Sequence, residues 1–542
     1  MNRHYISSDI HFSRFAELSE LEADYSRIDY DEKSEPNKAA GITITAERDE
    51  GGNVRAAIVD GTDTNTIVVS STAAGKTRRV LSPYVLSCIY AMHSFVIHDP
   101  KGELYSFFYS LLKKYGYEIR TLNFREPMTG DRLNILQPAA EQWKKGRRGR
   151  ALEMAREVAV TIYTPLEDKT DLFWTETAIN LFLCYFTIAV EIYEPEYVTL
   201  GAIYRIHVEG LDEENGLNKM KLYLEAHKNE KAYELGMPSV LAPRETKNSI
   251  YSVFASGIQR MLLNEEVEDI LTASTFSIED LASEKRPMAL FLITRDEAPK
   301  TYASVVASVV DIIYTTLIDM AQKHMDRRLP RMVHFILEEF GNIAMLENIN
   351  DMLTASRSRG IRILIIIQSL EQLYVQYSKE VAHILIGNAG NLVYMHSSDM
   401  ELVKLVSERC GSRLDPYTDN IQPLLSPDQL MQLDKKSGET LLLCGRHLPF
   451  ITYLPDLSAY QMIQPCEVHF SERKPLVLEK GVFDKCVEQI FEAKVNNIHN
   501  GGDFSSDNRE EEKEPKLSRY EMTTLSDTLR DRINVLIQNS EG

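Results

Sequence analysis

The chain has 542 residues, 44% of them hydrophobic and 26% charged, which is the composition of a globular protein with two or three domain cores. A formal net charge of −20 excludes a global field that attracts nucleic acid or an anionic membrane. Any DNA contact must therefore come from local basic patches or from a pore lined in an oligomer. Six scattered cysteines without a CxxC pair argue against a zinc site or a disulfide framework and indicate a reducing, cytoplasmic location.

The N-terminal segment, residues 1–55, is polar and opens with a short amphipathic pattern. Ser8 and Asp9 are a possible helix cap, and the apolar residues behind them recur every three positions: Phe12, Phe15, Leu18 and Leu21. This pattern predicts a helix that docks on the main body, with partner binding as the alternative. Residues 41–59 predict two short strands around a turn at 49–53.

No stretch of the sequence is expected to cross a membrane. The N-terminus lacks a signal-peptide pattern, and the longest apolar runs, Ala178–Val190 and Ile361–Ile367, are shorter than the ~20 residues that a membrane helix needs. We therefore expect the protein to reach a membrane only through a partner.

Residues 65–77, NTIVVSSTAAGKT, predict a buried strand, a loop and the start of a helix. Loop amides and a helix N-terminus bind phosphate oxygens, a lysine neutralises the β and γ phosphates, and a threonine hydroxyl reaches Mg²⁺. The candidate nucleotide-binding residues are Ser70, Ser71, Thr72, Ala73, Ala74, Gly75, Lys76 and Thr77. The pattern G-x-x-x-x-G-K-[ST] is not complete, because Ser70 stands at the first glycine position. The alternative is an ordinary strand-loop-helix with a chance GKT.

Alternating strands and helices continue through residues 56–140, the first part of a predicted α/β domain. A helix is expected over 78–91, a strand over Ser94–His98 that ends in Asp99-Pro100-Lys101-Gly102-Glu103, and a strand over Tyr117–Asn123. This spacing predicts a parallel sheet with helical crossovers, whose strand ends surround a ligand crevice.

Residues 141–280 predict an all-α insertion, because long helical patterns replace the strand signals. The insertion opens on a basic run: Lys144, Lys145, Arg147, Arg148 and Arg150. The run is either a solvated face or a DNA contact.

Residues 281–465 return to the α/β pattern. Strands are predicted over Met288–Thr294, Met332–Leu337, Arg362–Ile367, Leu392–Met395 and Glu439–Cys444, with a helix over Val305–His324. The C-terminal extension, 466–542, contains an acidic Gly/Ser-rich tether at 501–516 and a final amphipathic helix through Met522 and Leu536. That helix either packs on the body or binds a partner.

The apolar strand VHFIL ends in Glu338-Glu339, which is typical of the acidic half of a nucleotide site. We expect Glu338 to hold Mg²⁺ and Glu339 to activate the attacking water. Glu338 is one methylene longer than the more common aspartate, which would shift the metal contact. Gln368, after the next strand, is expected to sense the γ-phosphate or orient water. Arg357 and Arg359 either stabilise transition-state charge across a subunit interface or form a solvated basic loop.

The order of these motifs resembles that of the type IV secretion coupling proteins, the TraG/TraD-like ATPases of conjugation. The resemblance spans roughly residues 55–450 and rests on STAAGKTR, HDPKGELY, LNI, DLFWTETA, EEFGNIAMLENINDMLTASRSRGIRILIIIQSLEQL and IGNAGNLVYM. The family's usual forms are close to GSGKT, DPKGE, FW, DEFANI with a downstream RSR, Q(S/A) and a GN segment. Two features depart from the family: the N-terminal transmembrane helices are missing, and Ser70 and Glu338 differ from the common motifs.

The resemblance implies a RecA-like P-loop NTPase with a mainly parallel sheet, interrupted by an all-α domain, that assembles as a homo-hexamer around a DNA path. In such a protein Lys76 and Thr77 bind ATP and Mg²⁺, Glu338 helps to hold the metal and Glu339 is the catalytic base. Asp99 and Lys101 lie at the mouth of the same crevice. The expected partners are a relaxase–DNA complex or a secreted protein, the components of a type IV secretion channel, and a separate membrane anchor at the inner face of the membrane.

Two other functions fit the same residues. A docking scaffold would bind ATP structurally or not at all, because its nucleotide motifs are altered. A DNA translocase of the segregation or packaging type would track duplex DNA without a relaxase.

Overall fold

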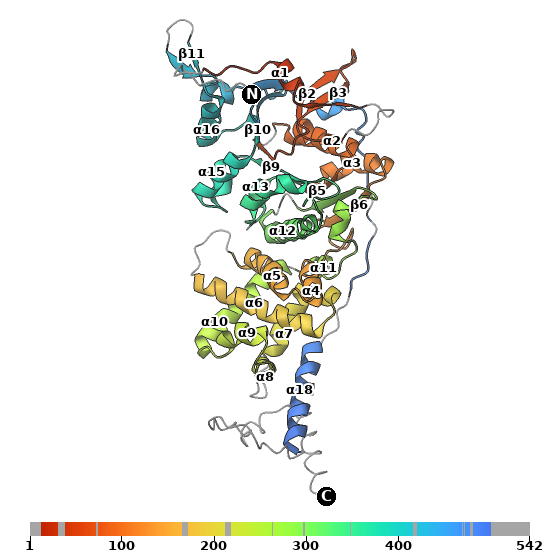
Figure 1. Cartoon of the computed structure of the whole chain (residues 1–542), viewed down its shortest axis with the longest axis vertical. Helices are drawn as coiled ribbons and strands as arrows, with labels where there is room; N and C mark the ends of the chain where they lie inside the picture. Colours follow the sequence, from red (N-terminus) through yellow and green to blue (C-terminus); the bar gives the residue numbers. More distant parts are fainter. Residues whose placement is uncertain are drawn as a thin grey trace. The chain divides into compact units, whose positions relative to one another are not determined.

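The computed structural model describes residues 12–30, 38–71, 74–164, 172–211, 218–262, 264–295, 297, 299–346, 348–415, 420–468, 470, 472–476 and 481–499 (Figure 1). The chain divides into two compact units. Unit 1 comprises Met1–Arg132 and Thr275–Lys474, and unit 2 comprises Leu133–Ser274 and Pro475–Gly542. The sequence placed the helical insertion at 141–280, whereas unit 2 begins at Leu133 because the segment before α4 already bonds within it, through Leu133 N–H to the Ile270 carbonyl.

Unit 1 is built on a nine-stranded sheet in the order β14-β13-β10-β4-β9-β8-β5-β7-β6. The strands from β10 to β6 are parallel, and β13 and β14 add antiparallel at one edge. In chain order they are β4 (Thr66–Ser70), β5 (Ser94–Asp99), β6 (Glu118–Asn123), β7 (Met288–Ile293), β8 (Val333–Leu337), β9 (Ile361–Ile367), β10 (Asn391–His396), β13 (Glu439–Cys444) and β14 (Phe450–Tyr453). The predicted mainly parallel α/β sheet is thus confirmed.

The five central strands are buried along their whole length. Every residue of β4, β9, β8, β5 and β7 is buried, and most of these residues are Val, Ile, Leu or Phe. Strands that helices cover on both faces have such continuous apolar runs instead of an alternating pattern. This explains why each strand could be recognised in the sequence to within one or two residues.

Helices connect and cover these strands. They are α2 (Ser82–Tyr90), α3 (Glu103–Lys114), α12 (Pro299–Gln322), α13 (Ile349–Arg359), α14 (Leu370–Tyr374), α15 (Lys379–Asn388), α16 (Met400–Cys410) and α17 (Pro427–Met431), with short 3-10 turns at Ile278–Ala282, Phe340–Asn342 and Leu457–Ala459. The helix expected over 78–91 is α2 preceded by a π-helical turn, Thr77–Leu81. Such turns are often found at functional sites.

The N-terminal part of the chain differs from its predicted form. The only helix here among the described residues is α1 (Leu18–Glu22), and Phe12 and Leu18 are exposed while Leu21 is buried. The prediction of an amphipathic helix is therefore wrong for residues 12–17. The backbone of these residues bonds to distant segments instead, and the Ser13 N–H donates to the Ser412 carbonyl. Ser8 and Asp9 lie outside the described residues.

Two small sheets complete unit 1. A three-stranded antiparallel sheet joins β1 (Ser26–Asp29), β3 (Val54–Val59) and β2 (Thr43–Arg48), and β2 and β3 are the two strands predicted around the turn at 49–53. A hairpin joins β11 (Ser412–Leu414) to β12 (Ile421–Pro423).

The described part of unit 2 is helical. The helices are α4 (Gln137–Lys144), α5 (Arg148–Tyr163), α6 (Leu172–Ile192), α7 (Leu200–Gly210), α8 (Lys219–Ala226), α9 (Lys231–Val240), α10 (Arg244–Met261), α11 (Glu265–Ile270) and α18 (Val482–His499), with a 3-10 turn at Pro195–Tyr197. Helix α6 is the centre of this unit and contacts α5, α7, α9 and α10 (Figure 1). The tether predicted at 501–516 and the final amphipathic helix lie outside the described residues.

Two helices of the described chain are long and apolar enough to cross a membrane, α6 and α12. The apolar windows of these helices are 61% and 78% buried inside the protein. Burial of this extent is also found in the core helices of globular domains, so length and composition alone do not make either helix a membrane span.

Candidate nucleotide site at the strand ends

The predicted site residues follow neighbouring strands at one edge of the sheet of unit 1. The phosphate loop follows β4, Gln368 follows β9, Glu338 and Glu339 follow β8, and Asp99 ends β5. These strands are adjacent in the order β4-β9-β8-β5 and run in the same direction, so their carboxyl ends meet. This edge is where parallel α/β sheets bind ligands.

The loop between β4 and the π-helical turn needs a glycine near its end. Gly75 has φ +83°, a left-handed conformation that a side chain would strain, and an added Cβ would lie 3.3 Å from the Arg79 side chain. The next turn is anchored on its far side, because Arg79 donates to the Leu454 carbonyl at 2.6 Å and Arg78 donates to Asp456. Thr72 and Ala73 lie outside the described residues.

Lys76 and Thr77 face the two glutamates at the end of β8. The Lys76 ammonium lies 3.5 Å from Glu339 Oε1 and 3.9 Å from Glu338 Oε1, and the Thr77 hydroxyl donates to Glu338 Oε1 at 2.7 Å. The side chains of Lys76 and Glu338 are 12% and 9% exposed. The structure thus places a cation, a hydroxyl and two carboxyl groups within contact distance, although they are more than 250 residues apart in the chain.

Glu338 is the most deeply buried of the acidic groups in this contact. Burial raises the pKa of its carboxyl group, and the Thr77 hydrogen bond and the Lys76 charge act in the opposite direction. For a buried carboxyl group with a single hydroxyl donor, a nearby cation stabilises the ionised form. Glu338 and Thr77 therefore present two hard oxygen atoms of the kind that Mg²⁺ prefers, and their role as metal ligands stays a prediction.

Glu339 is held in an unusual backbone conformation. Its φ of +52° and ψ of +49° are left-handed, which costs a residue with a Cβ about 1–2 kcal/mol. Asn342 donates its side-chain amide to Glu339 Oε2 at 2.9 Å, so each carboxylate oxygen has its own partner. Left-handed residues of this kind are often found at functional sites.

Asp99 belongs to the same group of acids. Its carboxylate accepts from the Tyr105 N–H at 2.9 Å, at the first turn of α3. Burial raises the pKa of Asp99 to about 7, and the nearby charges of Glu338 and Glu103 raise it as well. Lys101, two residues further on, is exposed.

Replacing Asp99 by asparagine is expected to make stability less dependent on pH. Because the folded chain holds the Asp99 proton more tightly than the unfolded chain, the stabilisation is complete below about pH 4 and is lost as the pH rises to about 7. Asparagine mimics the protonated form. The free energy of unfolding of Asp99→Asn minus that of the unchanged protein should therefore increase between about pH 5 and about pH 8, as measured by urea denaturation. An unchanged difference, equal to that of the exposed control Asp428→Asn, would contradict this.

Gln368 lies at the same edge, between the loop after β4 and the acids after β8. Its backbone is fixed by the Gln372 side chain, which accepts from the Gln368 N–H at 3.2 Å, and by the Ser397 hydroxyl, which donates to its carbonyl at 3.0 Å. The position agrees with the predicted one, while the role of its side chain stays a prediction.

Arg357 and Arg359 lie on the opposite side of the sheet from the candidate site, at the amino-terminal ends of the strands. They end α13, directly before β9, and donate to the carbonyls of Asp63 and Arg327, which precede β4 and β8. Within one chain these guanidinium groups therefore do not join Lys76 and Glu339. Their expected role in a neighbouring subunit's site stays a prediction.

Two polar residues at the site were missed in the sequence. His98 donates from Nδ1 to the Glu338 carbonyl at 2.7 Å, and Asn342 binds Glu339. Burial lowers the pKa of His98 to about 4, so its ring is neutral at physiological pH. The signal for His98 was its place before Asp99 at the end of an otherwise apolar strand.

The basic run of unit 2 is largely neutralised by nearby acids. Lys144 pairs with Glu194, Lys145 with Glu141, Arg148 with Glu191, and Arg150 with Glu153 and Glu157. The Arg148 guanidinium also lies over the Trp143 ring. These contacts favour the solvated-face interpretation of the run over a DNA contact.

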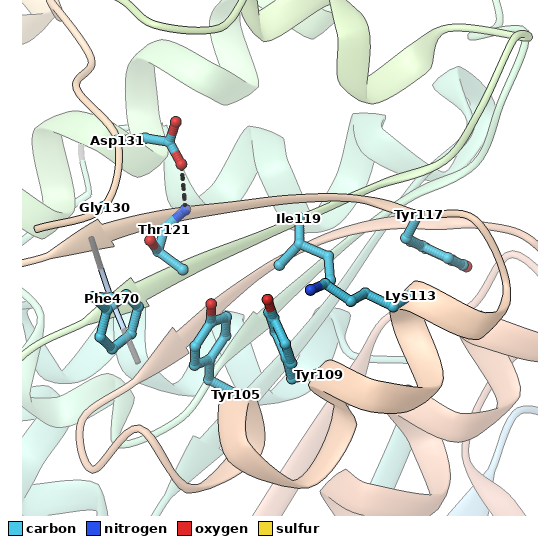
Figure 2. Close-up of a pocket in the computed structure, with 9 residues that line it drawn as sticks. All are labelled: Tyr105, Tyr109, Lys113, Tyr117, Ile119, Thr121, Gly130, Asp131 and Phe470. Carbon is cyan, nitrogen blue, oxygen red and sulfur yellow. Dashed lines mark hydrogen bonds between the residues drawn. The ribbon is translucent and has the colours of Figure 1, made fainter. Parts of the chain in front are cut away.

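A separate cavity of about 370 Å³ lies between α3 and the edge strand β6 (Figure 2). Tyr105, Tyr109 and Lys113 line it from the helix, Ile119 and Thr121 line it from the strand, and none of the predicted site residues does. The Tyr105 N–H nevertheless binds Asp99, so the helix that forms one wall begins at the candidate nucleotide site.

A strand-loop-helix that presents a lysine and a threonine to acids on a nearby strand end defines the class of RecA-like P-loop NTPase folds. Solved structures of the plasmid coupling protein TrwB share the fold. TrwB with ADP and Mg²⁺ has a TM-score of 0.60 at 15% identity, covering 86% of this chain and 96% of TrwB. TrwB with the non-hydrolysable analogue ADPNP has a TM-score of 0.59, also at 15% identity, covering 87% and 97%.

The family model for type IV secretory system conjugative DNA transfer matches residues 29–414. Protein VirD4 of Agrobacterium fabrum is 25% identical over 516 residues, which cover 89% of this chain and 73% of that protein. Protein VirD4 of Rhizobium rhizogenes is 24% identical over 412 residues, and the match spans 58% of its length. The chain belongs to the type IV secretory system conjugative DNA transfer family, and the resemblance to coupling proteins is confirmed.

Proposed function

We propose that this coupling protein is an ATP-driven motor that recruits a relaxase–DNA complex, or a secreted protein, to a type IV secretion channel and powers its transfer. The observation that carries the proposal is the contact of Lys76 and Thr77 with Glu338 and Glu339 at the ligand-binding edge of the sheet. A DNA-transfer family with this set of residues needs an energy source, and the set is the one that phosphoryl transfer uses.

ATP and Mg²⁺ fit the groups at this edge. The Lys76 ammonium is the counter-charge for the β and γ phosphates, and the left-handed Gly75 leads into a helical N-terminus, the kind of backbone that binds anions. Thr77 and Glu338 would hold Mg²⁺, which neutralises phosphate charge when bound. TrwB has been solved in complex with ADP and Mg²⁺ and in complex with ADPNP, which supports the same ligands here.

Each remaining residue receives a role from its position. Glu339 is the general base that accepts a proton from the attacking water, and Gln368 orients that water or contacts the γ-phosphate. Arg357 and Arg359, at the far edge, would act on the site of a neighbouring subunit. This arrangement requires a ring, for which a homo-hexamer is the state that the family resemblance implies.

The proposed partners follow from the family and from charge. The protein would work at the inner face of the membrane, where a channel component or another membrane anchor holds it. Since the chain is acidic overall and its basic run is paired, DNA contact would come from local basic groups brought together in a ring.

Steady-state ATP hydrolysis, alone and with single-stranded or duplex DNA, tests the proposal. DNA-stimulated turnover is the expected result. Turnover that never exceeds that of a Lys76 variant, even with a relaxase–DNA complex and the channel components present, would favour the docking scaffold. The departures from the common nucleotide motifs at Ser70 and Glu338 are the sequence argument for that alternative. Tracking of duplex DNA without a relaxase would favour a translocase of the segregation or packaging type.

Replacing Glu338 by glutamine is expected to weaken metal binding more than nucleotide binding. Glutamine preserves an acceptor for the Thr77 hydroxyl but removes the charge that would hold Mg²⁺. The Mg²⁺ concentration that gives half-maximal turnover should rise by about tenfold or more, whereas the Kd for ATP measured without metal should change by less than about threefold. An unaltered Mg²⁺ requirement would remove Glu338 from the metal site.

A further inference from the structure

The turn that presents Glu339 depends on contacts from other elements. A left-handed conformation is unfavourable for a residue with a Cβ, so its neighbours must hold it in place. Among the described non-glycine residues, only Met92 and Arg327 share a positive φ with Glu339. The contacts at the Glu338–Glu339 peptide therefore decide where the carboxylate of Glu339 points.

His98 holds this peptide from the neighbouring strand. Its Nδ1 lies 2.7 Å from the Glu338 carbonyl oxygen, and because a carbonyl only accepts, Nδ1 carries the proton. Nε2 is then the acceptor for the Thr294 hydroxyl, 3.2 Å away. Strand β5 lies between β8 and β7, so one buried ring connects the ends of both neighbours. His98 is 4% exposed, so water does not compete for either bond.

Asn342 holds the other end of the same turn. Its backbone N–H donates to the Glu339 carbonyl at 2.8 Å, and its side-chain amide donates to Glu339 Oε2 at 2.9 Å. Glu339 Oε1 remains directed toward Lys76 at 3.5 Å. Asn342 thus holds one carboxylate oxygen of Glu339, and the other oxygen faces Lys76.

We propose that His98 is a positioning residue for hydrolysis: by binding the Glu338 carbonyl through Nδ1–H, it keeps Glu339 in the left-handed turn that directs its carboxylate toward Lys76. The inference rests on the proposed function, in which Glu339 is the base. His98 does not touch the site of the reacting phosphate and acts through the Glu339 backbone. Loss of the bond would release the strained turn and misplace the base, for which displacements near 1 Å cost up to about a hundredfold in rate.

Three substitutions separate this role from simple packing. Asparagine presents an amide N–H at the δ position, where His98 has Nδ1, whereas glutamine presents it one bond further out, and leucine has no donor. We expect kcat of His98→Asn to stay within about threefold of the unchanged protein, and that of His98→Gln and His98→Leu to fall by about tenfold to a hundredfold. The KM for ATP should change by less than about twofold in all three.

Combination with Glu339→Gln gives the second measurement. If His98 acts through Glu339, adding His98→Gln to Glu339→Gln should lower kcat no further, since the two substitutions remove the same contribution. A purely structural role would instead lower the rate in both backgrounds. Should His98→Leu fail to fold, the asparagine and glutamine pair still decides the question.

The outcomes also separate this inference from the function on which it rests. Equal rates for the unchanged protein and Glu339→Gln would overturn both. A strong effect of Glu339→Gln, with equal kcat for His98→Asn and His98→Gln, with an additive loss in the double variant, or with KM rising in step with the loss of rate, would overturn the role of His98 alone.

Discussion

Replacing Lys76 by methionine is expected to lower ATP turnover by about a hundredfold or more and to weaken ATP binding by about tenfold. Methionine keeps an apolar stem of similar length in a site where Lys76 is only 12% exposed, so the change removes the ammonium with little loss of packing. The ammonium is the counter-charge for the phosphates, and it also lies between Glu338 and Glu339. Without it, two carboxylates would face the incoming nucleotide unneutralised.

Steady-state hydrolysis and equilibrium binding of a fluorescent ATP analogue measure both effects. Lys323→Met, at an exposed position after α12, is the matched control and should behave like the unchanged protein. Removing Lys76 also removes a charge that lowers the pKa of Glu338, so the variant should bind Mg²⁺ less well as the pH falls. Normal ATP turnover of Lys76→Met would contradict the proposed motor function and favour the docking scaffold.

Replacing Glu339 by glutamine is expected to lower the rate of ATP turnover by about a hundredfold to ten-thousandfold, while nucleotide binding persists. Glutamine is nearly isosteric and its carbonyl oxygen still accepts from Asn342, so the turn can keep its shape. The amide cannot take a proton from water. A loss of kcat without a rise in the Kd for ATP is the signature of a group that acts in the chemical step.

The neighbouring acid Glu103 provides the control for this substitution. It begins α3, is exposed, and is close enough to raise the pKa of Glu338 and of Asp99 through its charge. Glu103→Gln removes the same charge from the same region and should change kcat by less than about threefold, because this carboxylate is not directed at Lys76. Equal losses in the two variants would mean that net charge, and not the position of Glu339, supports hydrolysis.

The family and the parallel strands of unit 1 were readable in the sequence, whereas the short strands β1, β11 and β12 and the edge strand β14 were not predicted. Strands that are buried on both faces consist mostly of consecutive apolar residues, as β8 and β9 do, and the run ends where polar residues begin. The phosphate loop and the Glu338-Glu339 pair were recognised in the same way, because their residue types carry the chemistry that they perform. Helices with an exposed face, such as the one expected near Phe12, carry a weaker signal, and there the prediction was wrong.

The sequence alone determined the α/β class, the helical insertion, the motif residues and the family, because all of these depend on residue type and on spacing along the chain. Tertiary structure decided which of these residues meet. It brought Lys76 and Thr77 to Glu338, sent Arg357 and Arg359 to the opposite edge, and paired the basic run of unit 2 with glutamates. It also placed His98 on the Glu338 carbonyl. In unit 1 strand order sets these contacts, and in unit 2 the packing of helices does. Both result from packing between segments that are far apart in the chain, which no local pattern records.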